Sequence, residues 1–149
     1  MHDGQVAHLR NIVVDCWHPA SLARFWAAAL DGYAVAPYDE AELARLRANG
    51  IDDPEDDPWV LVERVDGGGP RLTFQRVPEG KAAEPRTGRR IHLDVMPTGR
   101  SRDDEVERLK KIGATEYEDH RKPDGTGWVT MADPEGNLFC VEPSAAERV

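Results

Sequence analysis

Hydrophobic and polar residues alternate along several short stretches of the chain, a pattern typical of β-strands with one buried face. Turn-forming residues, mainly glycine, proline and aspartate, separate these stretches. The predicted strands are Leu9–Cys16, Tyr33–Val35, Trp59–Val65, Arg71–Val77, Arg90–Val95, Thr115–Glu118, Trp128–Ala132 and Leu138–Glu142.

Other stretches have the spacing of helices, with apolar residues three and four positions apart. Potential caps mark their starts: Pro19 opens the first, while Asp39 and Ser101 are the capping residues of the second and third. The predicted helices are Ala20–Leu30, Glu40–Asn49 and Ser101–Ile112.

The two halves of the chain repeat the order strand, helix and three strands. Val14–Cys16 corresponds to Leu93–Val95 before each helix, and Gln75–Pro78 corresponds to Cys140–Pro143 at each end. One half alone would leave an apolar sheet face uncovered, so the two must pack together. We therefore predict an α+β fold of two βαβββ modules, whose curved mixed sheets surround a cavity.

This organisation corresponds to a single domain over 1–149. Module 1 is expected over about 7–78, a linker over 79–88 and module 2 over about 89–143. Module 1 carries an extra helix and an acidic loop over 37–58. We expect the acidic run Asp52–Asp57 to be solvated, because it lacks the glycine and the ligand spacing of a calcium loop.

A formal net charge of −9 makes nucleic acid and anionic membranes poor partners for this chain. It contains no apolar run of roughly 18 residues, the length needed to cross a bilayer, and its start lacks the features of a signal peptide. Two cysteines, Cys16 and Cys140, are too few for a disulfide framework. We therefore expect a cytoplasmic protein.

Several stretches together resemble one known family, the glyoxalase-like branch of the vicinal oxygen chelate superfamily. They are Ile12–Leu30, Gly69–Glu79, Ile91–Val95 and Trp128–Val141. The superfamily includes glyoxalase I, bleomycin-resistance proteins, fosfomycin-modifying enzymes and extradiol dioxygenases. The resemblance implies paired βαβββ modules, a homodimer, and a divalent metal held between modules by His, Glu or Gln side chains.

Carried over to this sequence, the family's four ligand positions fall on Asn11, Gln75, Arg90 and Cys140. Arginine has no lone pair to give to a metal, and the amides of Asn and Gln are weak neutral ligands. Cys140 looks like a lone cysteine, without His or Cys neighbours. We therefore predict a degenerate site with no metal and no other cofactor; a divalent metal is the alternative.

The same positions are candidates for binding a small organic ligand. A guanidinium such as Arg90, helped by Gln75 and Asn11, favours a carboxylate or another anion. The alternative for Arg90 is an ion pair with Asp94 or Glu142. Trp59 and Trp128 could line an apolar part of the pocket, whereas Phe74 and Phe139 should face the opposite side, under the helices.

His92 and Asp94 share a face with Arg90, because side chains alternate along a strand. A histidine beside a carboxylate can act as a general base; alternatively, His92 is hydrogen-bonded within the sheet and is structural. Asp94 is expected to bond backbone at the strand-to-helix turn, as Asp15 would in the other half.

Two functions follow from these residues. The first is binding of a small organic ligand, as in resistance-type relatives. The second is an enzyme of the lyase, isomerase or dioxygenase type, either metal-free with His92 as base or with metal ligands other than those above. Fold does not decide between them.

Overall fold

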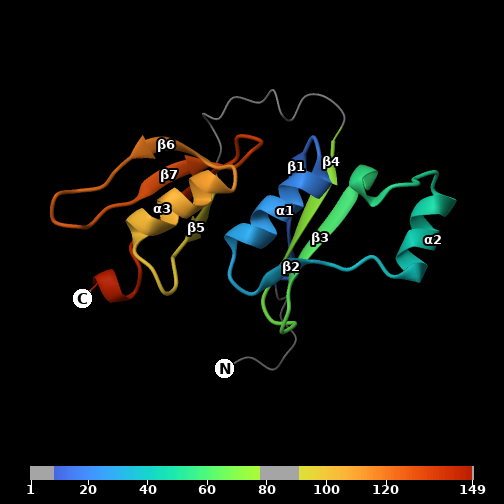
Figure 1. The fold of residues 1–149 in the computed structure, drawn as a ribbon, viewed down its shortest axis with the longest axis horizontal. Coiled ribbons are helices and arrows are strands. Elements are labelled where there is room, and N and C mark those ends of the chain that lie inside the picture. The colour runs from blue at the N-terminus through green and yellow to red at the C-terminus, as the bar shows by residue number, and fades with distance from the viewer. Residues whose placement is uncertain (1–8, 78–90, 149) are drawn as a thin grey trace. The chain divides into compact units, whose positions relative to one another are not determined.

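Each half of the chain forms its own four-stranded mixed sheet, as the computed structural model of residues 9–77 and 91–148 shows (Figure 1). The first unit is Met1–Ala27 with Gly32–Val77, and the second is Ala28–Asp31 with Pro78–Val149. Both sheets have the same topology: the first strand pairs in parallel with the last, and the two middle pairings are antiparallel. The predicted α+β fold of two βαβββ modules is thus confirmed.

The first unit contains a β-strand, a helix and three further strands, with an inserted helix and a 3₁₀ turn. Its elements are β1 (Asn11–Cys16), α1 (Pro19–Ala29), β2 (Tyr33–Val35), α2 (Glu40–Ala48), η1 (Pro54–Asp56), β3 (Trp59–Arg64) and β4 (Arg71–Arg76). The strands lie in the order β1-β4-β3-β2.

The second unit repeats this arrangement without the insertion. Its elements are β5 (Leu93–Val95), α3 (Arg102–Lys111), β6 (Thr115–Asp119), β7 (Val129–Ala132), β8 (Leu138–Val141) and η3 (Ala146–Arg148). The strands lie in the order β5-β8-β7-β6. β5 begins at Leu93, so the predicted strand from Arg90 is too long; Arg90 and the predicted linker 79–88 lie outside the described residues.

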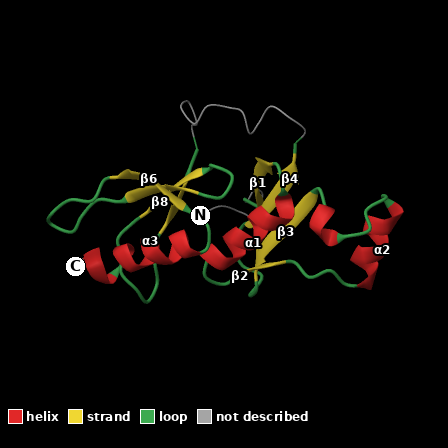
Figure 2. Ribbon diagram, turned by 45° about the horizontal axis from the view of Figure 1, so that its top comes forward, coloured by secondary structure: helices red, strands yellow, loops and turns green. Residues whose placement is uncertain are grey.

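Each sheet carries its helix on one face, α1 on the first and α3 on the second (Figures 1 and 2). Phe74 of β4 and Phe139 of β8 are 0 % and 1 % exposed, which confirms that these rings are core residues. Leu22 and Trp26 of α1 are buried in the first unit, as are Val106 and Leu109 of α3 in the second. Burial of these side chains provides the main stabilisation of each unit.

Local caps fix the helix starts where the sequence predicts them. The Asp39 carboxylate accepts a hydrogen bond from the Glu42 amide at 2.9 Å, and the Ser101 hydroxyl accepts one from the Asp104 amide at 3.1 Å. Both bonds satisfy amides that have no partner in the first helical turn. None of the helices in the described ranges is long and apolar enough to span a membrane.

The acidic loop of the insertion is not wholly solvated, which corrects the prediction at one residue. Asp57 is only 2 % exposed. Its carboxylate accepts hydrogen bonds from the Tyr38 hydroxyl at 2.7 Å and from the Trp59 amide at 3.0 Å. Burial and this hydrogen bond raise the pKa of Tyr38 above its ordinary value.

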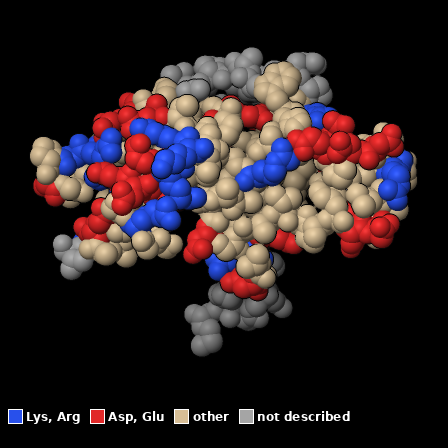
Figure 3. Space-filling model, in the orientation of Figure 1, with Lys and Arg blue, Asp and Glu red and all other residues tan. Residues whose placement is uncertain are grey.

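A second contact ties the insertion to α1. Arg24 donates to both carboxylate oxygens of Glu55, at 2.7 and 2.8 Å. Because this ion pair is exposed, it contributes little to the free energy of unfolding, but it holds η1 beside α1. Acidic side chains otherwise gather on the surface around α2 and η1, at the right of Figure 3.

The two buried phenylalanines give a direct test of the two cores. Phe74→Ala and Phe139→Ala should each lower the free energy of unfolding by about 3–5 kcal/mol, because each removes a large buried ring. Val65→Ala, at a position that is 76 % exposed, should change it by less than about 0.5 kcal/mol. Urea denaturation followed by circular dichroism measures all three. If either phenylalanine variant behaved like Val65→Ala, that residue would not be part of the core.

Candidate functional site

The face of each sheet that carries no helix is where the predicted site residues gather. Side chains alternate between the two faces of a strand, so the free-face residues have odd numbers in the first sheet and even numbers in the second. The free face of the first sheet carries Asn11, Val13, Asp15, Trp59, Arg71, Thr73 and Gln75. The free face of the second carries Asp94, Thr130 and Cys140, which are register partners across β5, β8 and β7.

Asn11 and Arg71 form the polar centre at one end of the first face. Arg71 Nε donates to Asn11 Oδ1 at 2.9 Å, and the Thr73 hydroxyl lies 3.5 Å from the same oxygen. Both terminal nitrogens of the half-buried guanidinium therefore remain available. No carboxylate in the described ranges pairs with Arg71, including that of Glu63 on β3. A guanidinium with unused terminal nitrogens has the donors that a carboxylate or another anion accepts from.

Gln75 and Trp59 lie at the other end of the same face. They are register partners, and the Trp59 ring is 45 % exposed. Gln75 Nε2 lies 3.5 Å from Asp15 Oδ1, which leaves the side-chain oxygen Oε1 of Gln75 able to accept a hydrogen bond. Because Arg71 and Gln75 are four residues apart on one strand, roughly 13 Å separates the two ends. The face is polar at one end and aromatic at the other.

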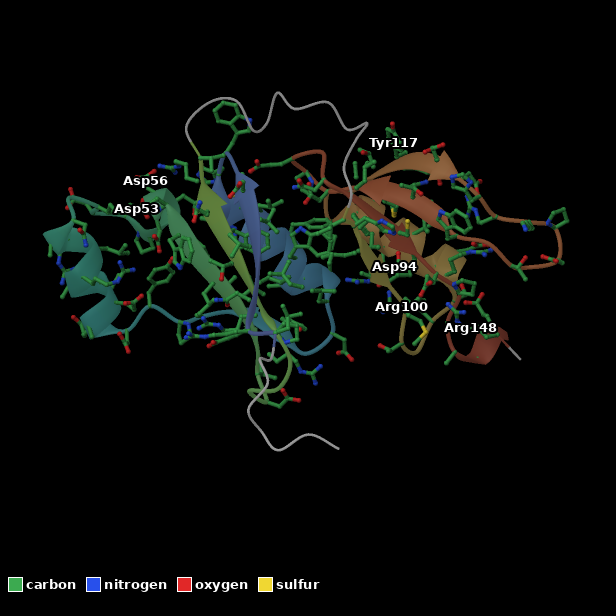
Figure 4. The ribbon with its side chains drawn as sticks, turned by 180° about the vertical axis from the view of Figure 1, so that it is seen from behind. Asp53, Asp56, Asp94, Arg100, Tyr117 and Arg148 are labelled. Atoms are coloured by element: carbon green, nitrogen blue, oxygen red, sulfur yellow. The ribbon has the colours of Figure 1, made fainter. Side chains whose placement is uncertain are left out.

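The second free face brings His92, Asp94 and Cys140 together. His92 Nε2 lies 3.1 Å from Asp94 Oδ1, and both side chains are about half exposed. Figure 4 views this sheet from the side opposite α3 and labels Asp94. The Asp94 carboxylate thus pairs with an imidazole, which corrects the expectation that it bonds backbone at the strand end.

A chain of hydrogen bonds supports Cys140 from the neighbouring strand. Trp128 Nε1 donates to Thr130 Oγ1 at 3.1 Å, and Thr130 Oγ1 lies 3.6 Å from Cys140 Sγ. An indole can only donate, so the Thr130 oxygen accepts there and its single hydrogen is free to point to the sulfur. His120 stacks on the Trp128 ring with centroids 4.6 Å apart.

The surroundings of Cys140 on this face favour the protonated form of its thiol. Burial raises the pKa of Cys140 above its ordinary value, and the negative charges of Asp94 and Glu142 raise it further. The hydrogen bond from Thr130 opposes this effect by lowering the pKa. Such a thiol is a poor nucleophile at neutral pH.

The structure groups the sequence-predicted residues into two sets. Asn11, Gln75 and Trp59 share the first free face. His92, Cys140 and Trp128 belong to the second set. Arg90 lies outside the described residues, so its anion-binding role stays a prediction.

Sequence reasoning missed Arg71 and Thr130. Strand alternation could have identified Arg71, because it is four residues from Gln75 on a predicted strand and therefore lies on the same face. Thr130 required the register of the β7–β8 hairpin, in which it lies opposite Cys140.

Asn11 and Cys140, two of the residues at the family's metal positions, have different surroundings. The Asn11 amide oxygen already accepts from Arg71. Cys140, however, is not the lone cysteine that the sequence suggested. Ligand atoms of His92, Asp94 and Cys140 all lie within 4.8 Å of one another.

Comparisons with known proteins agree with this architecture. A family model described as a glyoxalase-like domain matches residues 11–142. No curated protein matches the chain.

Several solved structures share the fold. A protein of Agrobacterium tumefaciens, solved by NMR, is 18 % identical with a TM-score of 0.58; the match covers 94 % of this chain and 99 % of that one. A glyoxalase/bleomycin resistance protein/dioxygenase family enzyme from Burkholderia phytofirmans is 15 % identical with a TM-score of 0.57, over 91 % and 97 % of the two chains. A glyoxalase family protein from Bacillus cereus is 19 % identical with a TM-score of 0.55, over 97 % and 99 %.

The structural neighbours support the fold alone, because their sequence identities are low. The family model covers most of the chain and matches the strands and helices described above. The chain therefore belongs to the glyoxalase-like domain family of the vicinal oxygen chelate superfamily.

Proposed function

We propose that this glyoxalase-like protein binds a small organic anion on the free face of its first sheet, with Arg71 as the anchor. The observation that carries the proposal is the Arg71 side chain, held by Asn11 at 2.9 Å with its terminal nitrogens unused by any described carboxylate. A guanidinium fixed in this way can bind a carboxylate with two parallel hydrogen bonds.

The rest of the face suggests the shape of the ligand. Val13 and Trp59 are both exposed on this face, and the side-chain oxygen Oε1 of Gln75 can accept a hydrogen bond. Since roughly 13 Å separates Arg71 from Gln75, an elongated ligand with a carboxylate at one end and an apolar ring at the other fits best. In this proposal Asn11 and Gln75 serve ligand binding, and the family's metal positions in the first unit are degenerate.

Arg71→Gln tests the anchor. It should raise the Kd for aromatic carboxylates such as 4-phenylbutyrate by about 10- to 100-fold, since charge-assisted hydrogen bonds contribute about 1.5–3 kcal/mol. Benzoate, cinnamate and 4-phenylbutyrate can be compared by calorimetry, and affinity should increase with length.

Arg76→Gln is the matched control, because Arg76 lies on the same strand but points to the opposite face. It should leave the Kd unchanged. Equal losses in the two variants would show general charge attraction, and the proposed anchor would be wrong.

An enzyme with His92 as general base is the second candidate. It is favoured by one observation, the 3.1 Å contact between His92 Nε2 and Asp94 Oδ1, since a carboxylate can orient an imidazole and raise its basicity. Such a base would remove a proton from carbon next to a carbonyl group.

Deuterium exchange detects this step without knowledge of the product. The protein should accelerate exchange of hydroxyacetone protons in D₂O, followed by NMR, and His92→Gln should reduce that acceleration by roughly 10²-fold or more. His18→Gln, in the first unit, is the control and should accelerate the exchange of hydroxyacetone protons as much as the wild type does. Equal exchange rates for the wild type and His92→Gln would rule out His92 as the base.

We further propose that the protein acts as a cytoplasmic homodimer. Support for a self-association surface comes from large exposed hydrophobic side chains on the free faces, including Val13 and Trp59 in the first unit and Trp128 near the second. Sedimentation equilibrium should give twice the chain mass of 16.6 kDa. A species of one chain mass at all concentrations would contradict the dimer.

A further inference from the structure

A thiol, an imidazole and a carboxylate meet on the free face of the second sheet. The geometry points to a binding site for a divalent metal ion of Zn²⁺ type, formed by His92, Asp94 and Cys140 within one unit. This inference is independent of carboxylate binding at Arg71, which belongs to the other sheet.

The distances suit such an ion after a small adjustment. The three ligand atoms lie within 4.8 Å of one another, and the His92–Asp94 pair is already at 3.1 Å. In a tetrahedral zinc site with bonds of 2.0–2.3 Å, neighbouring ligand atoms are roughly 3.3–3.8 Å apart. His92 and Asp94 are about half exposed, so their side chains can move the remaining distance.

The chemistry of the set also suits a borderline-soft ion. Sulfur and imidazole nitrogen are ligands that zinc prefers, and a single carboxylate completes a three-ligand site. Metal binding replaces the thiol proton: the Cys140 S–H bond breaks, an S–metal bond forms and the proton passes to solvent. The Asp94 carboxylate, whose oxygen lies within 4.8 Å of the Cys140 sulfur, attracts a cation to the same place.

A second layer of hydrogen bonds holds the sulfur in place. Thr130 is buried, accepts from Trp128 Nε1 and lies 3.6 Å from Cys140 Sγ, within reach of a hydrogen bond to the sulfur. Hydrogen bonds of this kind orient metal ligands and tune their affinity. Thr130 is thus a positioning residue for the proposed site.

The proposed ligand set differs from the one that the family resemblance implies. Of Asn11, Gln75, Arg90 and Cys140, only Cys140 belongs to it. Asp94 lies on β5, beside Cys140, and His92 directly precedes β5. All three ligands therefore come from the second unit. Three protein ligands leave a fourth position for water or a substrate oxygen.

Cobalt titration provides a readout that does not depend on activity. Protein freed of metal with a chelator should bind one equivalent of Co²⁺ and develop the near-ultraviolet absorption of a thiolate–cobalt bond. Cys140→Ser should abolish this band. Cys16→Ala, which removes the other cysteine, in the first unit, should retain it.

Two further variants separate ligands from supporting residues. Asp94→Asn should weaken Co²⁺ binding by more than 10-fold, whereas Asp15→Asn, at the corresponding position of the first sheet, should not. Thr130→Val should keep the band but raise the Kd for Co²⁺ by about 10-fold, the lower end of the effect of outer-shell partners on metal affinity. Circular dichroism verifies that each variant is folded.

A measurement on the wild type guards against variants that fail to fold. Excess Zn²⁺ should protect Cys140 from alkylation by iodoacetamide, as mapped by peptide mass spectrometry. The proposed site would be overturned if the wild type lacked the cobalt band or if Cys140→Ser retained it. It would also be overturned if Zn²⁺ did not slow the alkylation of Cys140. Arg71→Gln should bind Co²⁺ normally, so loss of carboxylate binding and loss of metal binding can be told apart.

Discussion

The parallel pairing of β1 with β4 and of β5 with β8 determines both the core and the chemistry of this protein. In each pair, side chains alternate between the helix side and the free face, so the register that buries Phe74 under the helix also places Gln75 on the free face. The same holds for Phe139 and Cys140 in the second unit. A shift of one residue would bury the polar set under a helix and expose the aromatic rings. Core packing therefore holds the candidate site residues on the free face.

Much of the fold could be predicted because its signals are local. Period-two alternation located the strands, and capping residues such as Asp39 and Ser101 act on amides three positions away. The buried Asp57 could not be predicted in this way, since its partner Tyr38 is 19 residues distant and only the folded insertion brings them together. An acidic run is normally a solvated surface, and nothing within the run itself marks one member as buried.

Strand alternation predicts which residues of the candidate site share a face of one strand, but not which residues of different strands are in contact. Alternation alone placed His92 and Asp94 on one side, and they are in contact in the structure. Contacts between strands require the register, which short stretches of sequence do not specify: Arg71 meets Asn11 across 60 positions, and Thr130 meets Cys140 across the hairpin. For this reason the sequence suggested an isolated cysteine, whereas the structure surrounds Cys140 with a hydroxyl, an imidazole and a carboxylate.

The proposed function requires that ligands bind the free face of the first sheet and not its helix side. Two tryptophans report on these surfaces: Trp59 lies on the free face and is 45 % exposed, while Trp26 of α1 is 3 % exposed. The most direct measurement is ¹⁵N NMR of the indole groups during titration with 4-phenylbutyrate, with signals assigned by Trp59→Phe and Trp26→Phe. If the ligand binds the free face, the Trp59 signal shifts in a saturable way while the Trp26 signal stays in place. A saturable shift of Trp26 with an unchanged Trp59 would contradict binding to the free face.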